Sequence, residues 1–426
     1  MFKVLVIAFY YPPLGLSGVQ RTLKFTKYFS NFNWQPTVIT SGSVNYFAYD
    51  ESLLKEVEDA NVRIIRTEAL TPGAFLLKKG KTKPKSTFIQ SILSKISKTI
   101  FIPDNKIFWA KKASKIALNL VKKEKFDAIF VTVPPFSSLV AITKLKAKLE
   151  IPIFADYRDA WVTNQYRFYP TPYHRYLHKK LEDRCLRKID RVIVVNRIIK
   201  EDIIKNFPFL KFNDIQIIPH GYDPEDFSNL IKYPKENDKM VILFAGAFYE
   251  GITPNFLLKA FKRLTIEQPD IAANIELHFV GNLKRENSKL IHNLKLEKFV
   301  KEIGYLNHLE TVRRIISSDV LWLMLPDNGK MYNVTPGKIY EYFAAKKPII
   351  ANLPEGIAKN LLLEYKASFI TSTENIEEIK TALITTHNLF AENKLPKPSD
   401  EFITKFDRVS QTEQLVKLFQ FHLKAE

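Results

Sequence analysis

The most chemically suggestive segment of the chain is the run TPGKIYE at residues 335–341. Pro336 suits the first turn of a helix and Thr335 can cap it, so the run predicts a helix start with free backbone amides. These amides and the Lys338 cation together favour a diphosphate group. Glu341 lies one turn later on nearly the same face, where it can accept hydrogen bonds from hydroxyl groups. The alternative is an ordinary capped helix with a Lys338–Glu341 ion pair.

Glycines near this run and at strand ends would let a ligand approach the backbone closely, because they carry no Cβ atom. Gly337 lies within the run, and Gly246 and Gly281 each follow an apolar stretch that predicts a strand. Tyr305 comes after the next predicted strand, where we expect it to frame a base. These residues predict a site for a diphosphate and for hydroxyl groups.

The first loop of the chain, residues 11–21, follows an apolar strand and opens a helix. Gly15 and Gly18 leave room for a ligand, and amides at the helix start can receive an anion, so we assign these glycines and Arg21 to an acceptor or phosphate loop. The spacing matches neither the dinucleotide fingerprint nor a Walker A loop. A plain turn between strand and helix is the alternative.

Residues 153–161, IFADYRDAW, form a second charged segment in which an apolar strand runs into Asp156, Arg158 and Asp159. In an α/β fold, charges at the carboxyl end of a strand lie at the edge of the ligand site. We expect a low pKa for a carboxylate beside an arginine, and therefore a role as acceptor or charge. Arg158, Asp159 and Lys338 are the candidate catalytic residues; the alternative for the first two is a structural pair that holds the loop.

Metal and disulfide chemistry find little support in the sequence. It has no D-x-D pair, no His/Cys/carboxylate cluster with metal spacing and no G-x-S-x-G elbow, so we expect neither a metal nor a bound cofactor. The single cysteine, Cys185, excludes an internal disulfide and fits a reducing compartment. His220 follows a predicted strand and is most simply a turn residue.

The elements that position these residues are short apolar strands alternating with amphipathic helices, a pattern typical of parallel α/β folds. The strands predicted in the first half are 4–9, 37–40, 63–66, 128–133, 153–156, 192–195 and 215–218. Those in the second half are 240–245, 275–280, 300–303, 320–325, 348–351 and 367–370. The main helices are predicted at 20–32, 109–123, 176–188 and 411–423.

The alternation restarts after the charged stretch 232–239, which predicts two α/β domains of similar architecture. We place the domains at residues 1–230 and 231–404, and we expect residues 405–426 to provide a closing helix that packs back onto the first domain. The predicted fold class is α/β, with two Rossmann-like domains that face a central cleft. Ligands in such sheets bind beyond the carboxyl ends of the strands.

The formal charge of +19 is unevenly distributed, with fourteen lysines against two carboxylates between Lys78 and Lys125. An anionic membrane surface and a solvated lysine-rich face both account for this region. No helix-turn-helix, zinc knuckle or aromatic stacking pattern is present, so we expect no nucleic acid partner. No signal peptide and no membrane-spanning stretch are evident, so we expect a cytoplasmic protein, peripheral on the inner face of the membrane.

Three motifs resemble those of family-four glycosyltransferases of the GT-B fold. Residues 156–161, DYRDAW, resemble the D-x-R-D-x-W stretch of a bacterial surface-polysaccharide branch. Residues 217–223, IIPHGYD, resemble the interdomain I-P-N-G-x-D, with His220 in place of asparagine. Residues 336–349 resemble the donor-site P-x-K-x-x-E-x-x-A-x-G-K-P. The resemblance covers nearly the whole chain.

The resemblance implies a retaining, metal-independent glycosyltransferase of cell-surface polysaccharide synthesis. The first domain would bind a glycan or lipid-linked acceptor, and the second a UDP- or GDP-sugar. The donor-binding residues would be Gly246, Gly281, Tyr305, Asn333, Thr335, Gly337, Tyr340 and Glu341. Asn333 replaces the first glutamate of the family's E-x7-E motif, and the usual basic pair after Gly246 is missing. A sugar-nucleotide epimerase of the same fold and a non-catalytic sugar-nucleotide-binding protein are the alternatives.

Overall fold

The computed structural model describes the chain except for short gaps and one long segment. The residues that it leaves undescribed are 16, 43, 45–48, 69–95, 98, 165–166, 229, 249–250, 330 and 426. The chain divides into two compact units: unit 1 contains Met1–Pro219 and Gln411–Glu426, and unit 2 contains His220–Ser410. The boundary predicted from the sequence lies between residues 230 and 231.

Unit 1 is built on a parallel sheet of seven strands in the order β3-β2-β1-β4-β5-β6-β7. The strands are β1 (Phe2–Ile7), β2 (Trp34–Ser41), β3 (Arg63–Thr67), β4 (Ala128–Val133), β5 (Ile153–Tyr157), β6 (Arg191–Val194) and β7 (Ile215–Ile217). Every strand predicted in the first half is present. The strand order reverses between β1 and β4, so the crossovers on either side of this pair leave in opposite directions.

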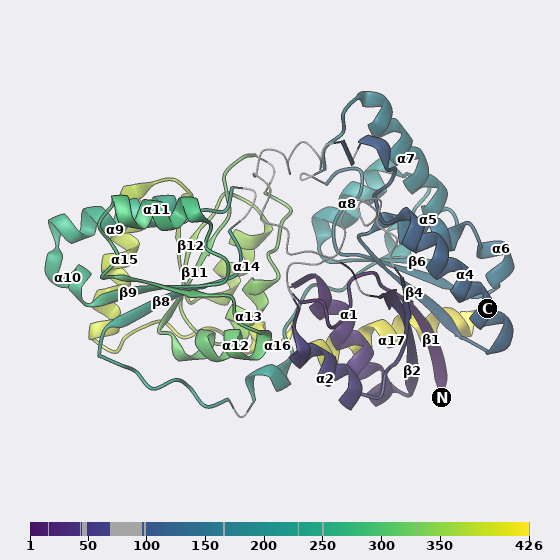
Figure 1. Cartoon of the computed structure of the whole chain (residues 1–426), viewed down its shortest axis with the longest axis horizontal. Coiled ribbons are helices and arrows are strands. Elements are labelled where there is room, and N and C mark those ends of the chain that lie inside the picture. The colour runs from purple at the N-terminus through teal and green to yellow at the C-terminus, as the bar shows by residue number, and fades with distance from the viewer. Residues whose placement is uncertain are drawn as a thin grey trace. The chain divides into compact units, whose positions relative to one another are not determined.

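Helices cover both faces of the sheet in unit 1, and each face has its own apolar core (Figure 1). The helices are α1 (Ser17–Tyr28), η1 (Phe29–Phe32), α2 (Glu51–Asp59), α4 (Ile107–Lys123), α5 (Phe136–Thr143), α6 (Lys146–Leu149), α7 (Pro172–Leu186), α8 (Arg197–Asn206) and η2 (Phe212–Asp214). Because both faces are covered, the strands are nearly continuous apolar runs.

The C-terminal helix α17 (Arg408–Ala425) completes one of these cores. Its residues Leu415, Val416 and Phe419 are buried among the strands and helices of unit 1. The Phe419 ring centroid lies 4.4 Å from that of Phe154 and 5.2 Å from that of Trp34. The end of the chain therefore belongs to the same unit as its beginning.

Unit 2 repeats the plan with six parallel strands in the order β10-β9-β8-β11-β12-β13. The strands are β8 (Met240–Ala245), β9 (Ile275–Val280), β10 (Val300–Gly304), β11 (Val320–Met324), β12 (Ile349–Asn352) and β13 (Ser368–Thr371). The helices are η3 (Pro224–Phe227), α9 (Asn255–Glu267), α10 (Pro269–Ala273), α11 (Arg285–Asn293), α12 (His308–Ser317), α13 (Lys338–Ala344), α14 (Ile357–Tyr365), α15 (Ile376–Ala391) and α16 (Asp400–Thr404). The prediction of two parallel α/β domains is thus confirmed.

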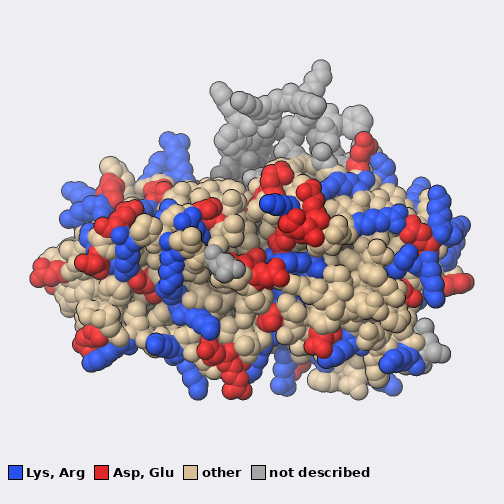
Figure 2. All heavy atoms as spheres, turned by 90° about the horizontal axis from the view of Figure 1, so that it is seen from below, with Lys and Arg blue, Asp and Glu red and all other residues tan. Residues whose placement is uncertain are grey.

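The charged surface is mixed. Lysine and arginine side chains alternate with acidic ones over the face that Figure 2 shows. Many acidic residues pair with basic neighbours, as in Arg63–Glu124 and Lys380–Glu267. On this face basic and acidic side chains are therefore interspersed rather than separated into large patches of one sign.

Candidate functional site

Two glycines mark the carboxyl ends of the central strands in unit 2. Gly246 follows β8 with φ +138°, and Gly281 follows β9 with φ +117°, both in the region that favours glycine. A Cβ atom on Gly281 would overlap the carbonyl oxygen of Gly246. The Gly246 N–H donates to the carbonyl oxygen of Val280 (2.9 Å), so the two strand ends are held together.

Lys338 lies directly against these strand ends. Its Nζ atom is 3.7 Å from the centroid of the Phe244 ring, and it occupies the space that a Cβ atom on Gly246 would need. Burial lowers the pKa of Lys338 to about 7, and the Glu341 carboxylate acts in the opposite direction. An anion bound here would raise this pKa and favour the ammonium form.

The start of α13 differs from the prediction. The helix begins at Lys338, its N-cap is Gly337, and neither Thr335 nor another side chain caps it. The Ile339 N–H donates to the carbonyl oxygen of Pro336 (3.0 Å). A tight turn therefore precedes the helix and uses one of its first amides. The expected cap by Thr335 and the helix start at Pro336 were wrong, and Lys338 is itself the first helical residue.

Two tyrosines of α13 fix the helix in unit 2. The Tyr342 hydroxyl accepts a hydrogen bond from the Ala245 N–H (2.9 Å), at the end of β8. Tyr340 is 1% exposed, and its ring lies 5.0 Å from Phe406 and 6.3 Å from His220. Tyr340 was expected to bind the donor, but its side chain faces the core, where it supports the helix that carries Lys338.

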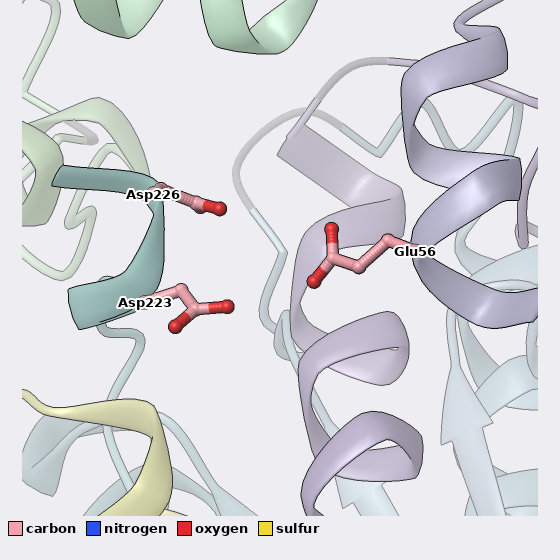
Figure 3. Close-up of side chains that lie close together, drawn as sticks. All are labelled: Glu56, Asp223 and Asp226. Atoms are coloured by element: carbon pink, nitrogen blue, oxygen red, sulfur yellow. The ribbon is translucent and has the colours of Figure 1, made fainter. Parts of the chain in front are cut away.

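A histidine outside the predicted site, His308, connects Glu341 to an acidic residue. The Nδ1 atom of His308 is 3.9 Å from Oε1 of Glu341, and its Nε2 atom is 2.9 Å from Oδ2 of Asp226. Figure 3 shows Asp226 on the short helix η3 and Asp223 directly before it, where Asp223 caps the helix by accepting from the Glu225 N–H. Asp226 lies just after the IIPHGYD run, so the sequence held a signal that could have pointed to it. No motif in the sequence pointed to His308.

The other predicted donor residues of unit 2 lie in different environments. Asn333 is 5% exposed and belongs to the segment that leads into α13, where Thr335 and Gly337 are half-buried. Tyr305 is 50% exposed just after β10, next to Gly304. The structure therefore brings Gly246, Gly281 and Lys338 together, with Glu341 one helical turn away.

In unit 1, Arg21 has a structural position. It is 1% exposed, and its guanidinium forms a bidentate pair with the buried Asp156 carboxylate at 2.8 and 3.0 Å. It also donates to the carbonyl oxygens of Ile218 (3.0 Å) and Pro219 (2.7 Å). Because these partners engage all three nitrogens inside unit 1, the assignment of Arg21 to a ligand-binding loop was wrong.

Arg158 closes the first loop. Its guanidinium donates to the carbonyl oxygens of Gly18 and Pro134, and a Cβ atom on Gly18 would be 3.6 Å from Nη1 of Arg158. Gly15 is buried in the same loop. The space at Gly18 therefore accommodates Arg158.

The pKa of Asp159 differs in direction from the expectation. The side chain is exposed, but the protein around it displaces enough water to raise the pKa of Asp159, while Arg158 acts in the opposite direction. The expectation of a low pKa was wrong because the loss of hydration outweighs the neighbouring cation.

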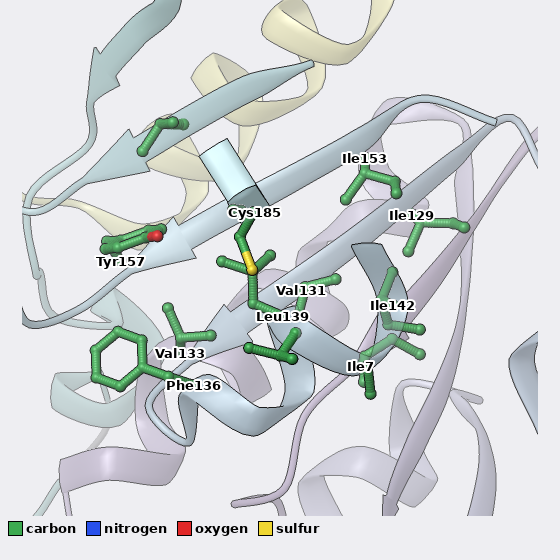
Figure 4. Close-up of a cluster of buried hydrophobic side chains, with 14 of the residues drawn as sticks. Ile7, Ile129, Val131, Val133, Phe136, Leu139, Ile142, Ile153, Tyr157 and Cys185 are labelled. Atoms are coloured by element: carbon green, nitrogen blue, oxygen red, sulfur yellow. The ribbon is translucent and has the colours of Figure 1, made fainter. Parts of the chain in front are cut away.

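A buried cluster lies behind this loop. Phe136, Tyr157 and Val133 pack together with Cys185 (Figure 4). Burial raises the pKa of the Cys185 thiol to about 11, so the thiol is a small apolar group, as the single cysteine suggested. The cluster supports the carboxyl ends of β4 and β5 from one side.

The two halves of the chain match two family models. Residues 21–226 match Glycosyltransferase Family 4, and residues 226–389 match Glycosyl transferases group 1. The chain is a glycosyltransferase. It belongs to the family-four glycosyltransferases whose motifs it resembles. The residues matched by the group 1 model include Gly246, Gly281, Lys338 and Glu341. Such an enzyme uses a nucleotide-sugar donor. No curated protein matches the sequence.

Solved structures of other glycosyltransferases share the GT-B fold of this chain. Sucrose-phosphate synthase from Thermosynechococcus elongatus superimposes with a TM-score of 0.66 at 13% identity, covering 100% of both chains. WaaG, a glycosyltransferase involved in lipopolysaccharide biosynthesis, gives 0.60 at 14% identity over 98% of this chain and 99% of its own. The lipopolysaccharide outer core galactosyltransferase WaaB gives 0.59 at 13% identity, with coverage of 97% and 98%.

Proposed function

We propose that this glycosyltransferase moves a hexosyl or related unit from a UDP- or GDP-sugar to a glycan or lipid-linked acceptor, with retention at the anomeric carbon and without a metal ion or other cofactor. The observation that carries the proposal is the position of Lys338. A cation held by Phe244 and Gly246 at the ends of the central strands is suited to the diphosphate of the donor.

The chemistry follows from the charge that develops. When the bond between the anomeric carbon and the diphosphate breaks, negative charge builds on the leaving oxygen, and a prepositioned ammonium stabilises it. In a retaining transfer the acceptor hydroxyl attacks from the face of the leaving group, and the diphosphate takes the hydroxyl proton. Glu341 accepts hydrogen bonds from donor hydroxyls, and the contacts of His308 with Glu341 and Asp226 position that carboxylate.

The experiment begins with a thermal-shift panel of nucleotide sugars on the full chain. The donor that stabilises the protein is then incubated with glycan and lipid-linked acceptors, and NMR of the product gives the anomeric configuration. Turnover of that donor should fall by orders of magnitude in Lys338→Ala and persist in Lys346→Ala, whose exposed lysine pairs with Asp400. Full activity of Lys338→Ala, loss of activity in EDTA, or conversion of the donor without an acceptor would contradict the proposal.

The cellular part of the proposal is surface polysaccharide synthesis on the inner face of the membrane. WaaG and WaaB, which share the fold, are lipopolysaccharide enzymes by name. No helix in the described part of the chain is long and apolar enough to cross a membrane. The basic region 78–125 was assigned to the membrane; residues 78–95 and 98 lie outside the described residues, and α4 exposes lysines such as Lys115 and Lys122.

Sedimentation with vesicles tests the membrane assignment. The protein should bind vesicles that contain anionic lipid at low salt and leave them as the salt concentration rises, because the attraction is between charges. Replacement of the α4 lysines Lys115 and Lys122 by glutamine should weaken this binding. A protein that stays in solution with anionic vesicles at low salt has no such membrane surface.

A further inference from the structure

A half-buried lysine lies where the strand order of unit 1 reverses. Crossovers leave β1 and β4 in opposite directions, and ligands of parallel sheets bind at such a switch point. Lys106 immediately precedes α4, and its Nζ atom is 4.9 Å from the centroid of the Phe9 ring, which follows β1 by two residues. The proposed function uses no residue at this position.

A carboxylate fixes the backbone of Lys106. Oδ1 of Asp104 accepts the Lys106 N–H (3.0 Å) and the Ser137 hydroxyl (2.7 Å), and Oδ2 accepts the Ser137 N–H (3.0 Å). Ser137 lies in the first turn of α5, just after β4. The segment before α4 is therefore attached to the carboxyl end of β4, and Lys106 is held at the switch point rather than on a free loop.

The charge of Lys106 has no ion-pair partner within 4.0 Å among the described residues. The undescribed segment 69–95 contains no aspartate or glutamate, so it offers no carboxylate either. Burial lowers the pKa of Lys106, and the Asp104 carboxylate acts in the opposite direction, although it forms no ion pair with the Lys106 ammonium. A partly dehydrated cation that faces a ring but has no counter-ion is unfavourable unless a ligand provides the anion.

Two guanidinium groups bind the backbone of the two segments that the Asp104–Ser137 contacts join. Arg158 donates to the carbonyl oxygen of Pro134, and Arg167 donates to that of Pro103 (3.2 Å). The Glu182 carboxyl group, on which Arg167 acts electrostatically, has its pKa raised to about 8 by burial, so it is mostly neutral at pH 7. Backbone carbonyls thus orient both guanidinium groups, and the Asp159 and Asp156 carboxylates offset part of the charge of Arg158.

We propose that Lys106 binds a phosphate group of the acceptor. The inference rests on the proposed function, since it takes unit 1 as the acceptor-binding half. A compact ammonium suits a phosphate, and the start of the long helix α4 adds a favourable dipole. The phosphate belongs either to a lipid carrier or to a phosphorylated sugar, and both present the same chemistry to Lys106.

Binding of inorganic pyrophosphate to the full chain, measured by calorimetry, tests the proposal in a double-mutant design. The wild type should bind two pyrophosphates per chain, one at Lys338 and one at Lys106. Lys106→Gln and Lys338→Ala should each retain one, and the double variant none. Lys106→Arg should retain the second site. The control is Lys111→Gln, an exposed lysine of the same helix whose Nζ atom also lies over a ring, 5.9 Å from Phe108.

The outcomes separate the two proposals. If Lys106→Gln is folded by circular dichroism and binds pyrophosphate as the wild type does, or if Lys111→Gln loses a site equally, the role of Lys106 is refuted. If Lys338→Ala keeps both sites, the donor assignment fails while the loss in Lys106→Gln still supports Lys106. Competition with a prenyl diphosphate in micelles and with a hexose phosphate then identifies the source; displacement by neither refutes the acceptor assignment.

Discussion

The Nζ atom of Lys338 fills the space that a side chain on Gly246 would occupy, at the end of β8. The lysine comes from the first residue of α13, which the Tyr342 hydroxyl ties to the Ala245 N–H. The backbone of a strand end and the cation of a helix start are thus fitted to each other. This relationship explains why a glycine stands at residue 246 and predicts what happens when it is replaced.

Gly246→Ala should displace Lys338 and raise the donor KM at least tenfold. The new Cβ atom overlaps Nζ and is 3.0 Å from Cε, so the lysine must move away from the Phe244 ring. The variant should also lose stability, by about 1 kcal/mol or more, because alanine disfavours the φ of +138°. Donor kinetics and thermal melting provide both measurements.

Gly329→Ala is the matched control. Gly329 also has a positive φ, +67°, but a Cβ atom there would meet no atom of the described residues within 4 Å. This variant should lose some stability and leave the donor KM unchanged. Equal kinetic effects in the two variants would mean that backbone strain, rather than contact with Lys338, determines the role of Gly246.

Lys338→Met should stabilise the protein most at low pH. Because the pKa of Lys338 is about 7 in the folded protein and 10.5 ordinarily, the unfolded chain binds more protons between these values, and the contribution of Lys338 to stability rises with pH across that window. Below pH 7 the folded protein carries the full charge of Lys338 in its partly dehydrated position, so removing it helps most there. Melting temperatures from pH 6 to pH 10 should show the advantage of the methionine variant shrinking; a constant difference would show that the folded pKa is not lowered.

The strands and the segment around Lys338 were predictable because they depend on local patterns. A buried parallel strand is a continuous apolar run, as in Ile275–Val280, and its ends can be located to within a few residues. The environment of Arg21 was not predictable, since its partner Asp156 is 135 residues away. Tyr340 was assigned to the donor because of its neighbours in the motif, whereas the direction of its side chain depends on how α13 packs against Phe406.

The helix start at residues 335–338 shows the same limit. Proline and threonine predict a capped first turn, but the chain enters α13 through a tight turn that leaves Gly337 as the N-cap. His308 gave no local signal because its contacts with Asp226 and Glu341 join three separate segments. Contacts between distant segments therefore decided those parts of the site that the motifs left undetermined.

Glu182→Gln should stabilise the protein at pH 8 relative to the wild type, by about 2–4 kcal/mol. The Glu182 side chain is buried and accepts from the Val162 N–H (3.1 Å), which glutamine can also do. Because burial raises its pKa from 4.5 to about 8, the folded protein holds a proton that the unfolded chain releases above pH 4.5. Wild-type stability from this group is therefore full below pH 4.5 and is lost as the pH rises to 8.

Urea unfolding at pH 5 and pH 8 measures the effect of Glu182→Gln. The two proteins should be nearly equally stable at pH 5, and the variant should be ahead at pH 8. Glu377→Gln is the control, since that exposed carboxylate pairs with Arg263 and Lys380 at the surface and should show no such trend. An equal effect at both pH values would indicate a change in packing instead of the loss of a titrating group.

Phe419→Ala should destabilise unit 1 by about 3–5 kcal/mol. The ring is fully buried, and besides Trp34 and Phe154 it lies 6.0 Å from the rings of Phe29 and Phe130. Its removal leaves a cavity between the C-terminal helix and the sheet. Trp34 lies beside this cavity, so its fluorescence should change at a lower urea concentration than in the wild type. Phe421→Ala, on the same helix but 65% exposed, should change stability by less than about 0.5 kcal/mol. If both variants unfold at the same urea concentration as the wild type, residues 411–425 do not contribute to the core of unit 1, and the first 219 residues form that core alone.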